Sequence, residues 1–156
     1  MQNYLDLMKK ILAEGEERND RTGVGTLSLF GQQLRYDLRE AIPAVTTKKL
    51  AWRSVVSELI WFLEGSGDER RLAELLHGSR VSDKNTIWTA NANADYWKPK
   101  AKFEGDLGRV YGVQWRDWRT YTFNGTSSYK ATDQVANLID GLKNDPSGRR
   151  HRSEEH

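Results

Sequence analysis

The feature that most restricts the fold of this chain is an apolar run between Leu50 and Leu63. Apolar residues recur there at helical spacing and spread over more than one face, namely Trp52, Val55, Val56, Leu59, Ile60, Trp61 and Phe62. A helix with so little polar surface must be covered by several other elements. The run is shorter than the ~20 residues of a membrane span, so it predicts a buried helix and no membrane partner.

Weaker patterns predict the other elements. Helices are expected over Asn3–Glu14, Asp68–His77 and Thr132–Lys143, and a β-hairpin over Leu27–Phe30 and Gln33–Leu38. A turn and a short aromatic helix are expected at 109–118, whereas 78–108 and 120–130 are polar and irregular. The pattern, with a length of 156 residues, predicts one domain of mixed helices and strands.

Charge and cysteine content exclude several classes of protein. The 24 basic and 22 acidic residues are too balanced to indicate a DNA or RNA partner, although tryptophans are interleaved with basic residues between 88 and 119. Three scattered histidines and no cysteine give no metal-ligand spacing, so no metal is expected. The lack of cysteine also excludes disulfides and a thiol nucleophile, and it is compatible with a reducing cytoplasm.

Three sites could carry chemistry, and spacing alone leaves two interpretations of each. Glu58 lies within the apolar run, either desolvated and suited to acid–base catalysis or at the edge of the run and facing water. Arg21 lies on a glycine-flanked loop, and Arg149 and Arg150 follow a Pro/Gly stop. These guanidinium groups could bind a phosphate, or they could be solvated loop and tail residues.

Five motifs, in order, resemble the thymidylate synthase family. They are NDRTGVGT from Asn19, VTTKK from Val45, ELIWFL from Glu58, DLGRVYGVQW from Asp106 and NDPSGRR from Asn144. Each motif has low specificity alone, but the ordered set is highly specific and spans Met1 to about His151.

The resemblance implies an α+β fold in which a mixed, curved β-sheet is packed with helices. Residues 1–151 would form the N-terminal part of one domain, and residues 152–156 are unlike the family. The implied reaction is the reductive methylation of dUMP to dTMP in dTMP biosynthesis, with 5,10-methylenetetrahydrofolate as co-substrate. The implied assembly is a cytoplasmic homodimer.

Matching positions also imply a role for individual residues. Arg21, Arg149 and Arg150 would bind the dUMP phosphate, the last two in the partner subunit's site. Glu58 and Tyr111 would serve proton transfer, and Lys48, Ile87 and Trp88 would contact the folate.

Two departures from the family pattern change the expectation. Ala51 stands where the family often has a histidine near the folate, and the cysteine that attacks the pyrimidine is absent. We therefore expect a truncated chain that is inactive alone and exposes apolar surface. The alternatives are a non-catalytic binding or dimerising module, and an enzyme like deoxycytidylate hydroxymethylase, which shares the fold and uses dCMP.

Overall fold

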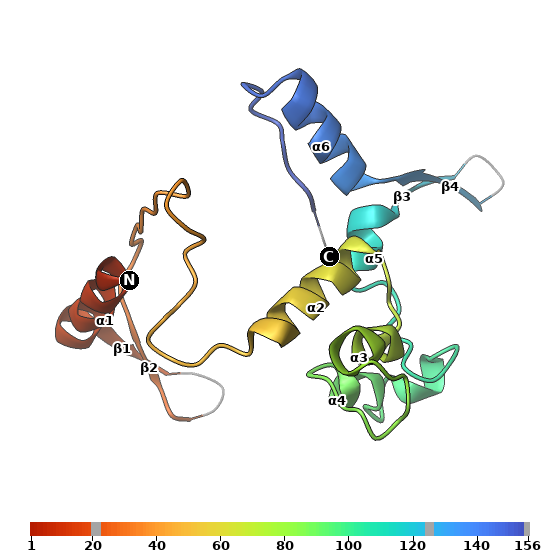
Figure 1. Cartoon of the computed structure of the whole chain (residues 1–156), viewed down its shortest axis with the longest axis horizontal. Helices are drawn as coiled ribbons and strands as arrows, with labels where there is room; N and C mark the ends of the chain where they lie inside the picture. Colours follow the sequence, from red (N-terminus) through yellow and green to blue (C-terminus); the bar gives the residue numbers. More distant parts are fainter. Residues whose placement is uncertain (20–22, 124–126, 155–156) are drawn as a thin grey trace. The chain divides into compact units, whose positions relative to one another are not determined.

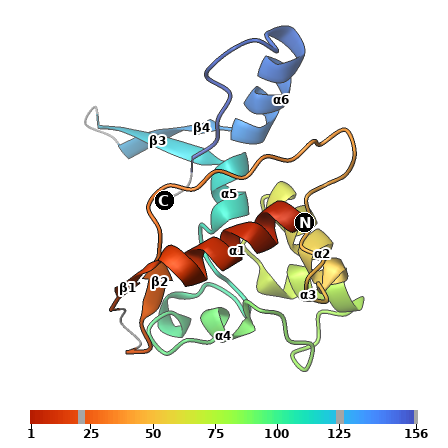
Figure 2. The same cartoon turned by 90° about the vertical axis from the view of Figure 1, so that its left-hand side faces the viewer.

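The computed structural model describes residues 1–19, 23–123 and 127–154, which divide into two compact units, Met1–Leu50 and Ala51–His156. The first unit holds helix α1 (Gln2–Glu14) and the antiparallel strands β1 (Glu16–Arg18) and β2 (Thr26–Ser28), with α1 beside β2 (Figures 1 and 2). The expected first helix is thereby confirmed.

The predicted hairpin in this unit is wrong in its pairing. Leu27 pairs with Glu17, and residues 33–38 form no strand. The observed connection, from Arg18 to Thr26, is longer than the predicted one between Phe30 and Gln33, and it contains Gly23 and Gly25, both with positive φ. The Arg35 carbonyl accepts a hydrogen bond from the Asn3 side chain at 3.1 Å instead of one from a neighbouring strand.

The second unit is built around helix α2 (Trp52–Leu63), which is flanked by α3 (Glu69–His77) and α5 (Tyr111–Arg116) (Figure 1). Its core consists of Trp61, Leu72, Ala92 and Leu107. The indole of Trp61 is fully buried and donates to the Asp68 carbonyl at 2.9 Å, so its one polar atom is satisfied. The predicted helices at 50–63 and 68–77 and the short aromatic helix are confirmed.

Close approach of α5 to α2 depends on one glycine. A Cβ added at Gly112 would lie 2.5 Å from both the Cα and the carbonyl oxygen of Phe62. Any larger residue would force the two helices apart. The approach sets Tyr111, at the start of α5, against the end of α2.

The segment 78–108 is irregular, as expected, apart from the short helices α4 (Thr89–Ala92) and η1 (Lys98–Lys100). It is not confined to the surface, because Ala92 and Leu107 belong to the core. This segment delivers Ile87 and Trp88 to the side of α2.

The expectation of an irregular 120–130 is wrong. Strands β3 (Trp118–Phe123) and β4 (Ser127–Thr132) pair antiparallel, with Tyr121 opposite Tyr129. Their rings lie 5.8 Å apart, and the Arg119 guanidinium lies 4.4 Å from the centre of the Tyr129 ring. Such cross-strand contacts stabilise a hairpin, and threonines and aromatic residues alternate over 120–123 as in a strand.

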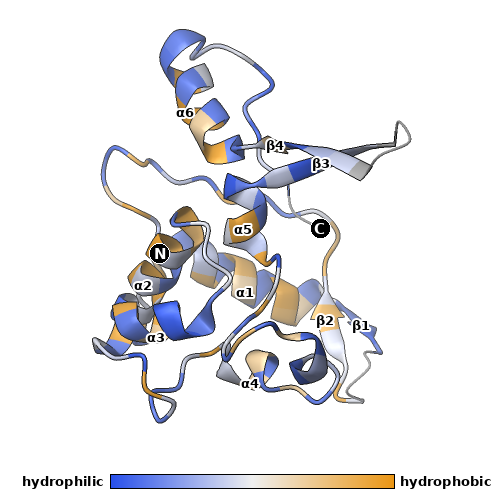
Figure 3. Cartoon of the chain, turned by 90° about the vertical axis from the view of Figure 1, so that its right-hand side faces the viewer, coloured by the Kyte–Doolittle hydropathy of each residue, from blue (hydrophilic) through white to orange (hydrophobic). Residues whose placement is uncertain are grey.

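Helix α6 (Gln134–Asn144) follows and carries both hydrophobic and hydrophilic residues (Figure 3). Its N-cap is Asp133, which accepts a hydrogen bond from the backbone N–H of Ala136 at 2.9 Å, so the helix predicted over 132–143 is confirmed with a start two residues later. The elements are therefore helices with separate antiparallel hairpins, an α+β arrangement.

One face of α2 stays uncovered. Six of its apolar side chains are 39–51% exposed, namely Trp52, Val55, Val56, Leu59, Ile60 and Leu63. The prediction of a buried helix is therefore wrong for this face, because only Ser57 and Trp61 of α2 are buried, whereas the expected exposure of apolar surface is observed. No helix among the described residues is long and apolar enough to cross a membrane.

Candidate active site

The centre of the site is a hydrogen bond between Glu58 on α2 and Trp88 just before α4. The indole Nε1–H of Trp88 donates to Oε1 of Glu58 at 2.6 Å. Glu58 is half-buried, so it is neither the water-facing nor the fully desolvated residue that spacing left open. An acceptor held by one neutral donor keeps its second oxygen available to a ligand.

Aromatic rings fix this pair from two sides. Trp88 lies 5.9 Å from Trp61 and 5.9 Å from Tyr111, measured between ring centroids. Phe62 meets Tyr111 edge-on at 5.6 Å with an interplanar angle of 89°. Tilted and edge-to-face contacts of this kind are the favoured geometry of aromatic pairs. Tyr111 is still 42% exposed, so part of it can contact a ligand.

An apolar cavity of about 140 Å³ lies beside Glu58. Its lining consists of Ala51, Ser54, Val55, Glu58, Leu72, Leu76, Thr86 and Ile87. Apolar walls with a few polar groups are typical of sites that bind flat heteroaromatic rings.

Two of the arginines expected to bind phosphate, unlike Glu58 and Trp88, are not held by hydrogen bonds of their side chains to other described residues. Arg149 and Arg150 lie beyond α6, are exposed, and have no hydrogen-bond or ion-pair partner within the described ranges. The backbone near them is anchored, because His151 Nε2 lies 2.7 Å from the Asp145 carbonyl and the Glu154 N–H donates to Gln134 at 2.8 Å. Their main chain is held while both guanidinium groups remain available.

The structure therefore brings together four of the predicted site residues, all in the second unit. Glu58, Ile87, Trp88 and Tyr111 share one side of the second unit. Lys48 is exposed in the first unit, and Arg21 lies outside the described residues. Arg149 and Arg150 do not contact the four-residue group within the part of the chain that is described.

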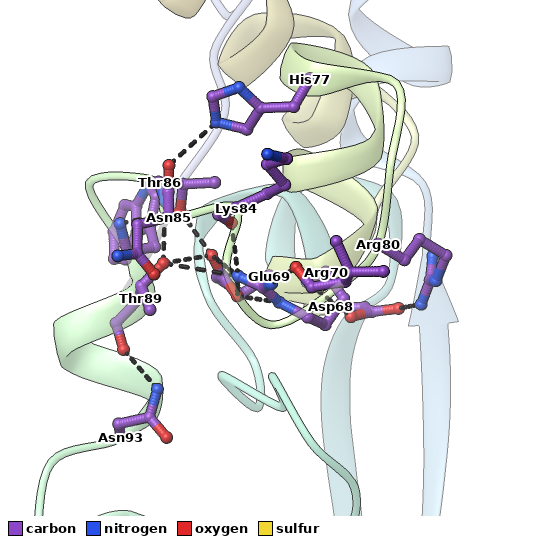
Figure 4. A network of polar contacts seen from close by, with 12 residues as sticks. Asp68, Glu69, Arg70, His77, Arg80, Lys84, Asn85, Thr86, Thr89 and Asn93 are labelled. Atoms are coloured by element: carbon purple, nitrogen blue, oxygen red, sulfur yellow. Dashed lines mark hydrogen bonds and ion pairs between the residues drawn. The ribbon is translucent and has the colours of Figure 1, made fainter.

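Sequence reasoning missed a second polar group behind Trp88. Glu69 and Arg70 are 1% and 6% exposed, and Glu69 accepts hydrogen bonds from Thr86 and Thr89 (Figure 4). The signal was present, because Glu69 precedes Leu72 and Ala73 by three and four residues and so shares their helix face.

Several carboxylates at the surface of the second unit form ion pairs with arginines. The pKa of Glu64 is lowered, mainly by hydrogen bonds from Arg71, and that of Glu74 is lowered by Arg71 and Arg80. Burial raises the pKa of Asp117, but hydrogen bonds from Arg119 and Arg109 outweigh it, so the pKa is lowered overall. These carboxylates are thereby kept ionised and paired. Among the described residues, no group of acidic or histidine side chains could hold a metal ion.

Comparisons with known proteins agree on one family. The family model described as thymidylate synthase matches residues 2–155. A protein of Escherichia phage T5 described as a probable thymidylate synthase is 48% identical over 151 residues, covering 97% of this chain and 50% of its own. The crystal structure of thymidylate synthase from T4 phage superposes with a TM-score of 0.76 at 42% identity, covering 97% of this chain and 48% of that one. The match confirms the expected fold, and the chain spans about half the length of these relatives.

Proposed function

The chain belongs to the thymidylate synthase family, and on that premise we propose that it supplies substrate-binding elements for the conversion of dUMP to dTMP. The observation that carries the proposal is the Trp88–Glu58 hydrogen bond, set among aromatic rings beside an apolar cavity. That arrangement offers an apolar wall to a flat ring and a carboxylate to its polar edge.

In this proposal the cavity side of α2 binds the folate. Ile87 and Trp88 contact the ring of 5,10-methylenetetrahydrofolate, and the exposed cation of Lys48 attracts its acidic tail. The bound co-substrate would supply the one-carbon unit and the hydride. The cavity supports this reading because its walls are apolar and Glu58 is its charged lining residue.

Glu58 and Tyr111 are proposed to handle protons. Glu58 uses one oxygen to accept from Trp88, which leaves the other oxygen to hold water or a ring N–H of the ligand. The partly exposed Tyr111, oriented by Phe62 and Trp88, can donate or accept at the pyrimidine edge.

The dUMP phosphate is proposed to bind Arg21, Arg149 and Arg150. Arg149 and Arg150 are exposed and have no partner among the described residues, which supports this role, because available guanidinium groups bind a dianion bidentately. We propose that these two act in the site of a second subunit of a homodimer, in the cytoplasm, whose reducing conditions suit a cysteine-free chain.

No residue of this chain can add a thiol to the pyrimidine, because the sequence contains no cysteine. We therefore expect the purified chain to form no dihydrofolate from dUMP and methylenetetrahydrofolate. A full-length chimera, in which this chain replaces the matching half of the T5 relative, is expected to restore turnover. A folded chimera without dUMP-dependent turnover would contradict the proposal, and turnover with dCMP instead would favour the hydroxymethylase reaction.

Variants of the chimera test the assigned carboxylate. Glu58→Gln keeps the size of the side chain but removes its charge, and it is expected to lower kcat by roughly a hundredfold or more. The matched control is Glu64→Gln on the C-cap of the same helix, where the carboxylate pairs with Arg71 at the surface. Equal effects of the two changes would remove Glu58 from the mechanism.

A binding or dimerising module is the second candidate, favoured by the free Arg149–Arg150 pair and the absent cysteine. This candidate predicts mixed dimers when the chain is added to the T5 relative, visible by native mass spectrometry. Detecting no mixed species at equimolar concentration would remove it.

A further inference from the structure

Glu69 and Arg70 form a deeply buried ion pair at the start of α3. Arg70 donates from Nε to Glu69 Oε2 at 2.7 Å and from Nη2 to Oε1 at 2.8 Å, and both side chains are over nine-tenths buried. A buried ion pair is costly to desolvate and often stabilises a fold no more than apolar residues would. Stability therefore does not explain the pair, and its other contacts are informative.

Those contacts converge on a single segment, residues 81–89. Arg70 donates from Nη1 to the Val81 carbonyl at 2.7 Å and from Nη2 to the Lys84 carbonyl at 3.0 Å (Figure 4). Glu69 Oε1 accepts from the hydroxyls of Thr86 at 2.7 Å and Thr89 at 2.6 Å. Residues 78–87 form no helix or strand, so side-chain hydrogen bonds take the place of a backbone ladder in fixing them.

The two threonines transmit this placement to Trp88. The Thr86 hydroxyl donates to Glu69 and accepts from the backbone N–H of Trp88 at 3.1 Å. The Thr89 hydroxyl donates to the same oxygen and accepts from the backbone N–H of Thr86 at 2.8 Å. Each hydroxyl proton therefore has one direction, and the main chain on both sides of Trp88 is fixed.

We infer that the Glu69–Arg70 pair is a positioning device that sets the Trp88 indole against Glu58 through the hydroxyls of Thr86 and Thr89. Its residues are positioning residues, because none of them is assigned a contact with the substrate. The effect on catalysis rests on the proposed function, whereas the effect on the position of Trp88 does not.

Fluorine NMR of the chain labelled with 5-fluorotryptophan tests the inference without substrate. The Trp88 resonance is assigned with Trp88→Phe, and its response to Glu58→Gln reports the indole–carboxylate hydrogen bond. In Glu69→Gln and Arg70→Lys backgrounds, the Trp88 resonance is expected to shift and its response to Glu58→Gln to be lost. Matched changes in the exposed pair, Glu64→Gln and Arg71→Lys, should leave both unchanged.

A Trp88 resonance that keeps its position and its response to Glu58→Gln in a folded Glu69→Gln chain would overturn the inference. Should Glu69→Gln fail to fold, as shown by the Trp97 resonance, Thr86 replaces it as the test. Thr86→Ser retains the hydroxyl and should preserve the Trp88 signal, whereas Thr86→Val should shift it. Identical spectra for these two variants would overturn the inference.

The chimera separates this inference from the proposed function. Glu69→Gln is expected to raise the KM for methylenetetrahydrofolate by about tenfold while the KM for dUMP stays nearly constant, because displacement of a ring-contacting side chain weakens only its own ligand. Equal rises in both KM values would contradict the positioning role. An inactive chimera would contradict the proposed function, and the fluorine spectra would still decide the inference.

Discussion

The two groups of predicted site residues in the second unit differ in how fully the protein has arranged them. Trp88 and Glu58 are hydrogen-bonded to each other, Trp88 makes tilted and edge-to-face contacts with neighbouring rings, and a buried ion pair holds the segment around it. Arg149 and Arg150 have an anchored main chain but side chains without partners in the described ranges. The difference suits the proposed ligands, because recognition of a ring edge needs fixed geometry, whereas a phosphate dianion can order flexible guanidinium groups by charge.

The largest effect on stability should come from removing Trp61, the buried ring on which Trp88 packs. Trp61→Ala deletes a fully buried indole that packs against Phe62 and Trp88, and it should cost about 3–5 kcal/mol of unfolding free energy. Urea unfolding of the purified chain measures this cost. A loss below about 1 kcal/mol would mean that this core does not organise the unit.

A slightly smaller effect should follow from leaving one buried charge alone. Glu69→Ala strands the buried Arg70 and should cost about 3 kcal/mol. Glu64→Ala breaks a half-exposed pair with Arg71 and should cost less than about 1 kcal/mol. Urea unfolding of both variants, compared at equal m-values, measures the two costs. Equal urea midpoints would contradict the expected difference between the buried and the surface ion pair.

Acid should weaken the unit through Asp117. Its pKa is lowered overall, because hydrogen bonds from Arg119 and Arg109 outweigh burial. This carboxylate therefore adds stability above its unfolded pKa of about 4, and that contribution is lost as the pH falls through the lower folded value. Asp117→Asn should lower Tm at neutral pH and converge with the parent chain below about pH 3.

The control for this change is Asp140→Asn, because Asp140 accepts from Asn144 and has no ion-pair partner in the described ranges. Its Tm difference from the parent should not depend on pH in the same acidic window. A Tm difference between Asp117→Asn and the parent chain that is the same at every pH would contradict the link between the Asp117 pKa and stability.

The smallest effect on stability should come from the phosphate arginines. Arg149→Ala and Arg150→Ala should change the unfolding free energy by less than about 0.5 kcal/mol, because both side chains are exposed and neither is paired with another described residue. In the chimera each should nevertheless raise the KM for dUMP by at least about tenfold, since charge-assisted hydrogen bonds to phosphate are lost. Calorimetric unfolding and steady-state kinetics on the same samples would separate the two effects.

Sequence reasoning succeeded where one element carries its own pattern. The helix around Trp61 was predicted from its spacing because a continuous apolar run specifies a helix without reference to a partner. The pairing of Leu27 was not predicted, because its partner strand, Glu16–Arg18, is entirely charged and carries no strand pattern of its own. The β3–β4 hairpin was not predicted, although threonines and aromatic residues alternate over 120–123, because the alternating stretch is short and the stabilising Tyr121–Tyr129 contact joins two separate strands.

The site shows the same limit. Glu58 was recognised as a candidate from its apolar surroundings, but its partner Trp88 lies thirty residues away and no local pattern joins them. The Glu69–Arg70 pair was overlooked because adjacent opposite charges usually indicate a solvated surface, and only the helix face shared with Leu72 argues otherwise.

Hydrogen exchange of tryptophan indole N–H groups, followed by NMR on the purified chain, tests the central claim most directly. The claim is that Glu58 holds Trp88 in place before any ligand binds. The Trp88 indole should exchange roughly ten- to a hundredfold more slowly than that of the half-exposed Trp52, and Glu58→Gln should abolish most of that difference. Equal exchange rates for Trp88 and Trp52 in the parent chain would contradict it.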